Sequence, residues 1–526
     1  MNREDLLAPE MYNLVEEVER FAINPEKVAI KWEDEQGNKE EITYANLMTR
    51  VNKIGNALLS AGLKKGDKAI IMVPRLIDAY AVYLGCLKVG ITVSPGSEML
   101  REKDIRYRLI HGEMKAVISV DSLVNEFDQI NDIEFEKFVI GKPVEGWLDL
   151  KSLEADASDI LELADTKADD MAFLSYTSGT TGNPKGVVHT HGWGFAHLRT
   201  AASGWLGIQE GDTVWATAAP GWQKWIWSPF VSVLGSGATG FVYHGKFDAN
   251  KYLQLLEDNA VNVLCCTPTE YRVMAKVRNI SDYKLPSLRS AVSAGEPLNR
   301  EVIDTFRQYF NVTVRDGYGQ TENTLLVGIM EGMEVRSGSM GKPTPGNRVD
   351  IINEDGEPCS AGEVGDIAVH RETPALFKNY YKDPERTAMQ FRGEWYVTGD
   401  RAKKDEDGYF WFEGRSDDII ISSGYTIGPF EVEDALVKHP AVKECAVVGS
   451  PDEVRGTIVK AFVVLREGID QIQQEELVKE LQEHVKNLTA PYKYPRKVEF
   501  IEELPKTTSG KIRRIELRQK ELQQNA

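Results

Sequence analysis

The densest run of glycines and hydroxyl side chains in this chain lies between residues 176 and 186, directly after the apolar run 171–175. The apolar run is typical of a buried strand. Glycines let backbone N–H groups point into one concavity, Ser and Thr hydroxyls donate to phosphate oxygens, and a lysine adds a compact positive charge. The pattern therefore predicts a phosphate-binding loop at the end of a strand, made of Thr177, Ser178, Gly179, Thr180, Thr181, Gly182 and Lys185.

A Walker-type loop is the nearest alternative, and it requires Gly-x-x-x-x-Gly-Lys-Ser/Thr running straight into a helix. Here Gly186 follows the lysine, and residues 187–189 are Val-Val-His, which favour a strand. No Ser or Thr follows the lysine to hold magnesium. The sequence thus predicts a phosphate loop of another kind, with a flexible surface loop as the remaining alternative.

Length and composition bound the architecture. A chain of 526 residues with 42% apolar residues is too long for one core and should form a large body plus at least one further domain. Between residues 43 and 120, helical and strand patterns alternate, which is typical of α/β layering with largely parallel strands. We therefore predict an α/β fold: a large multi-subdomain N-terminal body of layered sheets and helices, and a small mobile C-terminal α/β domain.

Charge and apolar patterning restrict the partners. The net charge of −19 argues against a nucleic-acid-binding surface. The amino terminus lacks the pattern of a signal peptide, and no apolar run approaches the ~18 residues of a membrane span. We expect a cytoplasmic protein with no transmembrane segment and small-molecule substrates.

Cysteine and histidine spacing gives no sign of a metal site. The five cysteines have no Cys-x-x-Cys spacing, and Cys265 and Cys266 lie in a strand-like run where thiols act as small apolar groups. His189 and His191 are two residues apart but no third ligand type accompanies them. We expect structural roles for all four side chains.

Further short motifs follow the loop in order. They are Ser293-Ala-Gly-Glu-Pro-Leu298, Asp316-Gly-Tyr-Gly-Gln-Thr-Glu322, Trp395-Tyr-Val-Thr-Gly-Asp400, the polar segment 412–420, Ser423-Gly-Tyr-Thr-Ile-Gly-Pro-Phe-Glu-Val-Glu433 and Pro505-Lys-Thr-Thr-Ser-Gly-Lys-Ile-Arg-Arg514. Each is weak alone. Together they resemble the AMP-forming acyl-CoA synthetases of the adenylate-forming superfamily, and most of all the short/medium-chain group. The resemblance runs from about Glu41 to Arg514.

The resemblance implies a site for ATP. It places the backbone of Gly295, Glu296 and Pro297 along the adenine, with Tyr318 stacked near it. Asp400 fits a ribose because a carboxylate has two acceptor oxygens for a diol, and Arg415 would contact ribose and phosphate. Asp316, Gly317, Gly319 and Gln320 complete the implied nucleotide-binding set.

The same resemblance implies the catalytic residues. Thr321 would contact the α-phosphate, and Glu322 would bind Mg²⁺, a cation that favours oxygen ligands. Lys511 would be the catalytic lysine, which also contacts ATP. An ammonium that bridges the carboxylate and the α-phosphate would stabilise charge during an in-line displacement.

The acid and coenzyme A sites are predicted less directly. Trp222 and Gly319 are the candidates for the acyl pocket. By the resemblance, glycine stands where acetyl-specific relatives carry a tryptophan, so the pocket should admit longer or branched acids. The alternative is that Trp222 or Trp225 closes this space from another side. The candidates for coenzyme A are Ser423, Gly424, Tyr425, Arg455, Tyr494 and Arg496. Thr426 stands where the medium-chain relatives usually carry arginine, so a phosphate contact from that position is in doubt.

The predicted organisation is a large adenylate-forming domain over residues 1–414, a hinge over 415–417 with Asp417 as its pivot, and a small domain over 418–526. The implied activity is ATP-dependent conversion of a short- to medium-chain acid, straight or branched, to acyl-CoA through acyl-AMP, with release of AMP and pyrophosphate. ATP, Mg²⁺ and coenzyme A would be required, and the protein would act as a monomer or homodimer. The alternatives are an adenylating ligase for an aromatic acid or a carrier-protein acceptor, and a non-catalytic nucleotide sensor.

Overall fold

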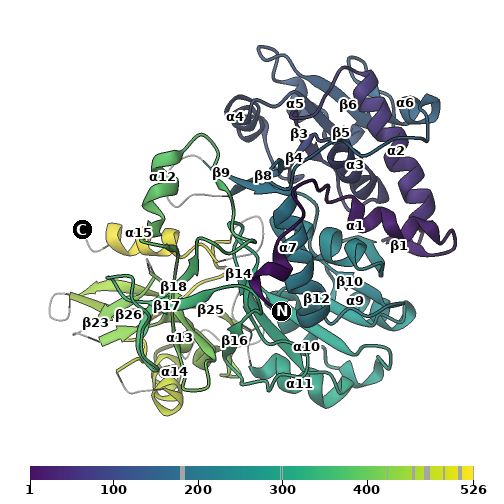
Figure 1. Ribbon diagram of the computed structural model, residues 1–526. Coiled ribbons are helices and arrows are strands. Elements are labelled where there is room, and N and C mark those ends of the chain that lie inside the picture. The colour runs from purple at the N-terminus through teal and green to yellow at the C-terminus, as the bar shows by residue number, and fades with distance from the viewer. Residues whose placement is uncertain are drawn as a thin grey trace.

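The computed structural model describes residues 1–177, 184–295, 298, 300–416, 418–422, 425–452, 456–466, 474–489, 492–506 and 512–524. Helices and strands alternate along the first part of the chain, and a smaller group of elements follows at the carboxyl end (Figure 1). The predicted α/β class, with a large N-terminal body and a separate C-terminal domain, is confirmed. No helix in the described ranges is long and apolar enough to cross a membrane.

The smaller sheet of the body is built mainly from the first third of the chain. Within the described residues it has eight strands in the order β19 (Asn379–Tyr380), β9 (Lys185–Thr190), β8 (Met171–Thr177), β4 (Thr92–Pro95), β3 (Lys68–Met72), β5 (Ala116–Val120), β6 (Glu136–Ile140) and β7 (Leu148–Asp149). Strands β8, β4, β3, β5, β6 and β7 pair in parallel, whereas β9 is antiparallel to both neighbours. The central strands β8, β4, β3 and β5 are largely buried and mostly apolar, as expected for parallel strands that are covered on both faces.

The larger sheet has fourteen strands in the described part of the chain. Its order is β17 (Val349–Ile352), β18 (Val364–His370), β21 (Trp395–Lys404), β22 (Phe410–Arg415), β16 (Ser339–Pro343), β15 (Leu325–Gly328), β14 (Val314–Gly319), β13 (Ser290–Ala294), β12 (Val263–Cys266), β10 (Thr213–Ala216), β11 (Thr239–His244), β1 (Val28–Asp34) and β2 (Lys39–Thr43), with β20 (Phe391–Arg392) on β21. Strands β1, β11, β10, β12, β13 and β14 pair with one another in parallel, β2 is antiparallel to β1, and the sheet is antiparallel from β15 onward.

Helices of the body cover both sheets (Figure 1). They are α1 (Glu16–Glu19), α2 (Tyr44–Ser60), α3 (Ile77–Lys88), α4 (Glu102–Gly112), α5 (Asn125–Asp128), α6 (Leu150–Asp156), α7 (His191–Ala201), α8 (Gln223–Trp225), α9 (Ala249–Asp258), α10 (Pro268–Ala275), α11 (Arg300–Phe310) and α12 (Pro384–Met389), with π-helices η4 (Ala202–Leu206) and η5 (Ile226–Leu234). As the pattern predicts, Thr43 caps α2 by accepting a hydrogen bond from the Asn46 amide.

One apolar core joins the two sheets. It contains residues of β3, β4 and β8 from the smaller sheet, of β10, β12 and β13 from the larger one, and of α2, α3, α7 and η5. Helix α7 and η5 are therefore buried between the sheets. This places β8 and β9 on one side of α7 and β14 on the other, where the predicted site residues lie.

The C-terminal group has its own core. Strands β25 (Val442–Asp452), β26 (Gly456–Leu465) and β27 (Lys497–Phe500) form one sheet, and β23 (Ile420–Ser422) pairs with β24 (Tyr425–Ile427). Alternate residues of β25 and β26 face α13 (Pro429–Val437) and α14 (Gln474–Leu488), or the opposite side with α15 (Arg514–Gln524). Helix α13 also packs against β22 of the body.

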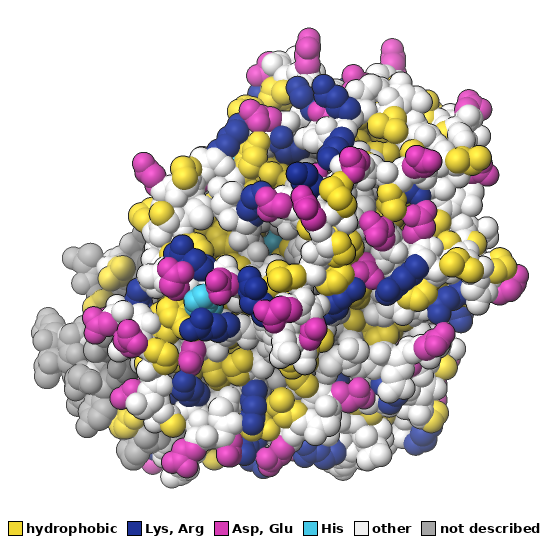
Figure 2. All heavy atoms as spheres, in the orientation of Figure 1, with side chains coloured by type: hydrophobic (Ala, Val, Ile, Leu, Met, Phe, Trp, Pro, Cys, Tyr) yellow, Lys and Arg dark blue, Asp and Glu magenta, His cyan; other side chains and the backbone are white. Residues whose placement is uncertain are grey.

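The surface carries charges of both signs. On the face shown in Figure 2, Lys and Arg side chains lie interspersed with Asp and Glu. All five cysteines are buried and unpaired, as predicted for Cys265 and Cys266 in β12.

Candidate active site

The predicted phosphate loop connects β8 to β9. Thr177 at the end of β8 pairs with Lys185 at the start of β9 in an antiparallel register. A strand, not a helix, follows the lysine, as the Val-Val-His run predicts. Ser178, Gly179, Thr180, Thr181 and Gly182 lie outside the described residues.

Lys185 meets Glu322 and Tyr380 at the base of this hairpin. Its Nζ lies 3.5 Å from Glu322 Oε1 and 3.1 Å from Tyr380 Oη, and Tyr380 donates to the same Glu322 oxygen at 2.8 Å. Glu322 is buried, and burial also raises the pKa of Tyr380. Tyr380 comes from β19, which pairs with β9. No motif pointed to it, since its place in the site depends on sheet pairing between segments almost 200 residues apart.

Asp400 accepts hydrogen bonds from two polar side chains of the 316–322 segment. Its Oδ2 accepts from Tyr318 Oη and from Gln320 Nε2, both at 2.6 Å. Across the β21–β22 pair, Asp400 is in register with Arg415. The structure therefore brings together four residues that the sequence predicts for the nucleotide site.

Asp316 anchors the second nucleotide segment to β14. Its carboxylate accepts from the Gly317 amide at 2.8 Å and from the Leu298 amide at 3.4 Å. Burial raises the pKa of this carboxyl from its ordinary 3.8 to about 7. Gly295 just precedes this contact with φ +113°, while Glu296 and Pro297 lie outside the described residues.

The opposite face of β14 is flanked by tryptophans. A Cβ placed on Gly317 would lie 2.6 Å from the Trp205 ring, and one on Gly319 would lie 2.8 Å from Trp227 and overlap the Thr324 carbonyl oxygen. The side chain beside Gly319 is thus Trp227. Because side chains alternate along a strand, Tyr318 faces Asp400 while Gly317 and Gly319 face the tryptophans.

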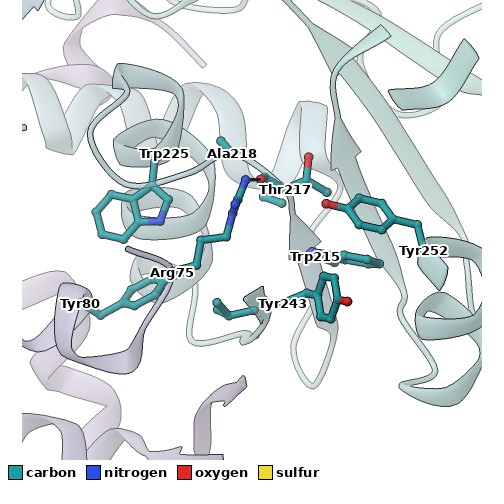
Figure 3. A pocket seen from close by; sticks show the side chains of 10 residues that line it. Arg75, Tyr80, Trp215, Thr217, Ala218, Trp225, Tyr243 and Tyr252 are labelled. Atoms are coloured by element: carbon teal, nitrogen blue, oxygen red, sulfur yellow. Dashed lines mark hydrogen bonds between the residues drawn. The ribbon is translucent and has the colours of Figure 1, made fainter. Parts of the chain in front are cut away.

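The two tryptophans considered from the sequence differ in burial, and Trp222 stays a prediction for the acyl pocket. Trp222 is half-buried at the start of α8. Trp225 is buried against Tyr80 and lines a small cavity with Arg75, which donates to the Thr217 carbonyl oxygen at 2.9 Å (Figure 3). This cavity is lined by residues of α3, β10, β11 and α9 and is separate from the predicted nucleotide residues. Of the two tryptophans considered as alternatives for closing the space beside Gly319, Trp225 packs against Tyr80, and the tryptophan ring next to Gly319 is that of Trp227.

A stack of rings links this tryptophan to Thr321. Centroids lie 5.3 Å apart between Trp227 and His197, 5.1 Å between His197 and Trp193, and 4.4 Å between Trp193 and His189. His189 Nε2 then contacts the Thr321 carbonyl oxygen at 2.6 Å, so the imidazole donates. Burial lowers the pKa of His189 to about 4 and that of His197 to about 3, which makes both rings neutral at pH 7.

No metal-binding group of three His, Cys, Asp or Glu side chains occurs among the described residues. Glu322 still fits a Mg²⁺ ion, because magnesium in nucleotide sites is held by one or two carboxylates together with substrate phosphates and water. His191 accepts from the Leu14 amide, a structural role as predicted.

The coenzyme A candidates are described in part. Arg496 Nη1 donates to Tyr494 Oη at 2.7 Å, and Lys486 lies over the Tyr494 ring at 4.5 Å. Tyr425 begins β24, and the backbone of Thr426 pairs with Ile421. Ser423, Gly424, Arg455, the hinge residue Asp417 and the catalytic candidate Lys511 lie outside the described residues.

Comparison with known proteins agrees with this architecture. The chain belongs to the AMP-binding enzyme family, which its sequence matches over residues 18–381. Residues 431–511 match the AMP-binding enzyme C-terminal domain.

Particular relatives cover nearly the whole chain. It is 63% identical to the uncharacterized acyl–CoA ligase YtcI of Bacillus subtilis (strain 168), over 100% of this chain and 99% of the relative. It is 42% identical to the mitochondrial acyl-coenzyme A synthetase ACSM3 of Mus musculus, over 98% and 91%. A crystal structure of the anthranilate CoA ligase AuaEII with anthranoyl-AMP superposes with a TM-score of 0.92 at 29% identity, over 100% of both chains.

Proposed function

We propose that this protein is an ATP-dependent acyl-CoA synthetase that activates a short- to medium-chain carboxylic acid, straight or branched. The predicted class, an AMP-forming carboxylate–CoA ligase, is confirmed by family membership and by the acyl-CoA ligases among its relatives. A carboxylate oxygen attacks the α-phosphorus of ATP and pyrophosphate leaves. The thiol sulfur of coenzyme A then attacks the acyl carbon, and AMP leaves.

The observation that carries the proposal is the arrangement around Glu322. A cation, Lys185, and a carboxylate, Glu322, lie at the base of the hairpin that bears the predicted phosphate loop. Asp400 accepts hydrogen bonds from Tyr318 and Gln320, which closely precede Glu322 in the chain. Such a site can hold a triphosphate at one end and a ribose at the other. Glu322 would hold Mg²⁺, which would neutralise phosphate charge when bound.

Individual roles follow from chemistry and position. Lys185 would contact phosphate oxygens and Thr321 the α-phosphate, while Asp400 and Arg415 would bind the ribose. Lys511, from the other domain, would complete the site for adenylate formation and leave before thioester formation. Tyr494 and Arg496 are adjacent and suit the phosphates of coenzyme A, together with Ser423, Gly424, Tyr425 and Arg455.

We further propose domain boundaries at residues 1–414 and 418–526 with a hinge at 415–417. Two features support them: β22 ends at Arg415, and every strand after residue 418 in the described residues pairs within the C-terminal group. Rotation about such a hinge would complete first the site for adenylate formation and then the site for thioester formation. We propose a cytoplasmic monomer or homodimer.

A panel of carboxylic acids with ATP and coenzyme A tests the function, with AMP release and acyl-CoA formation as readouts. Straight and branched acids of short to medium length should give both products. The tryptophans beside β14 and the similarity to an anthranilate CoA ligase favour one alternative, an aromatic acid, which the panel should therefore contain. AMP without acyl-CoA would indicate another acceptor, such as a carrier-protein thiol, and the absence of pyrophosphate exchange would indicate a non-catalytic nucleotide sensor.

A further inference from the structure

Lys224 has an unusual orientation for a lysine. Its Nζ atom is buried and has no hydrogen-bond partner among the described residues, although the residue as a whole is only half-buried. Lysines at protein surfaces normally do the reverse, burying the aliphatic stem and keeping the ammonium group in water. A buried ammonium without a hydrogen-bond acceptor is costly. Two indole rings attract the Lys224 ammonium through their faces but accept no conventional hydrogen bond from it.

The ammonium lies at the tryptophan face of β14. Nζ is 4.7 Å from the centroid of the Trp205 ring and 5.7 Å from that of Trp227. These rings lie against Gly317 and Gly319 respectively. Trp227 begins the ring stack that ends at Thr321, where the reacting carboxylate would meet the α-phosphate, so Lys224 lies at the far end of that stack from Thr321. This position suits the distal end of a bound acid.

The neighbouring unpartnered atoms are also donors. Trp227 Nε1 and Gln223 Nε2 are buried without a hydrogen-bond partner in the described part of the chain. The other amide atom of Gln223, Oε1, accepts from Ser175 Oγ at 2.6 Å, which fixes Nε2 as the atom left over. Three donors within residues 223–227 would suit a ligand with acceptor oxygens.

The backbone of this segment is held in place. Trp225 packs against Tyr80, Tyr83 and Phe230 with centroids 4.9, 4.8 and 5.2 Å away (Figure 3 shows Trp225 and Tyr80). Gly221, at φ +93°, comes so close to Gly96 that a Cβ would lie 2.5 Å from the Gly96 carbonyl oxygen. With Trp225 on one side, Lys224 and Trp227 are directed to the other.

Resting on the proposed function, we propose that the acid substrate carries an acceptor oxygen at its distal end, with a second carboxylate as the best fit, and that Lys224 binds it. The ammonium and the indole and amide N–H groups would then all be paired. A site built to hydrogen-bond a substrate group discriminates strongly against the analogue that lacks it, since its buried polar groups are left unpaired. Trp205 and Trp227 would limit the length of the chain between the two ends.

The test is kcat/KM for pairs of acids matched in length, one aliphatic and one with a terminal carboxylate or carbonyl. Butyrate, isobutyrate and hexanoate pair with succinate, methylmalonate and adipate, with AMP release as the readout. For the wild-type protein we expect the oxygen-bearing member to be preferred by at least about tenfold. Lys224→Met keeps an unbranched stem and should reverse that preference, chiefly through a higher KM for the oxygen-bearing acid.

Controls separate specificity from folding and from the proposed function itself. Lys224→Arg should restore part of the preference, Lys103→Met, at an exposed position, should leave it unchanged, and thermal unfolding should show that all variants fold. An aliphatic preference in the wild-type protein that Lys224→Met leaves unchanged would overturn the inference while the synthetase function stands. If no acid releases AMP, both fall.

Discussion

Replacing Asp316 by asparagine gives the sharpest test of the electrostatics at the nucleotide segment. The Asp316 carboxyl is buried and accepts hydrogen bonds from two backbone amides, those of Gly317 and Leu298. Its pKa is raised to about 7 because burial penalises the ionised form more than these hydrogen bonds favour it. Asparagine keeps a side-chain carbonyl oxygen and cannot ionise.

The magnitude and sign follow from linkage between protonation and folding. Each pKa unit corresponds to about 1.4 kcal/mol, so a rise from 3.8 to about 7 amounts to on the order of 4 kcal/mol. Below pH 3.8 the carboxyl is protonated in both states and contributes nothing. As the pH rises from about 4 to 7, the unfolded chain releases this proton while the folded protein retains it. This group therefore lowers stability progressively over that window, and its effect is constant above pH 7.

The assay is unfolding of wild-type and Asp316→Asn protein from pH 4.5 to 8, compared as the difference between the two. The stability of the variant relative to wild type should rise from pH 4.5 to 7 and then level off. Asp258→Asn, at an exposed position on α9, controls for the general effect of removing a carboxylate. A difference that is flat with pH, or that falls as the pH rises, would refute the reasoning.

Three further outcomes are expected. Lys511→Ala should abolish acyl-adenylate formation, measured by pyrophosphate exchange, yet spare thioester formation from supplied adenylate; equal loss of both would remove Lys511 from its proposed role. Gly319→Ala should destabilise the protein by more than about 2 kcal/mol, because its Cβ would overlap the Thr324 carbonyl oxygen. The control Gly240→Ala, whose Cβ would lie 3.4 Å from Val233, should cause a much smaller loss of stability in thermal unfolding. Similar losses for the two variants would contradict the overlap. Tyr380→Phe removes the hydrogen bond to Glu322 and should slow pyrophosphate exchange by about tenfold, a loss of about 1.4 kcal/mol, in a variant that still folds; full exchange would show that this bond is dispensable.

Local sequence patterns predicted several helices and strands of the fold correctly. The helix that begins after Thr43, the strand before the Ser/Thr/Gly loop and the strand after Lys185 are all where the sequence places them. These features depend on neighbours within a few residues, such as a capping hydroxyl or a β-branched pair. Family motifs extended the prediction to residues such as Asp400 and Tyr318, which the structure joins by a hydrogen bond.

Contacts between distant segments could not be predicted in the same way. Tyr380 reaches Glu322 only because β19 pairs with β9. The segment 220–227 carries three tryptophans, and nothing in its local pattern distinguishes the one in the core, Trp225, from the one beside β14, Trp227. That choice depends on which face of a short helix packs against α3. The buried ammonium group at position 224 is likewise visible only once the packing is known.

In the proposed function, strand β14 would contact two ligands because its side chains alternate. Tyr318 turns toward the proposed nucleotide site, and its glycine neighbours turn toward the proposed acid site. Substitution of Trp205 or Trp227 should therefore change the range of acids that the protein accepts and leave ATP binding unchanged. A single-residue insertion in this strand would move its side chains to the opposite faces, and binding of ATP and of the acid should then be lost together.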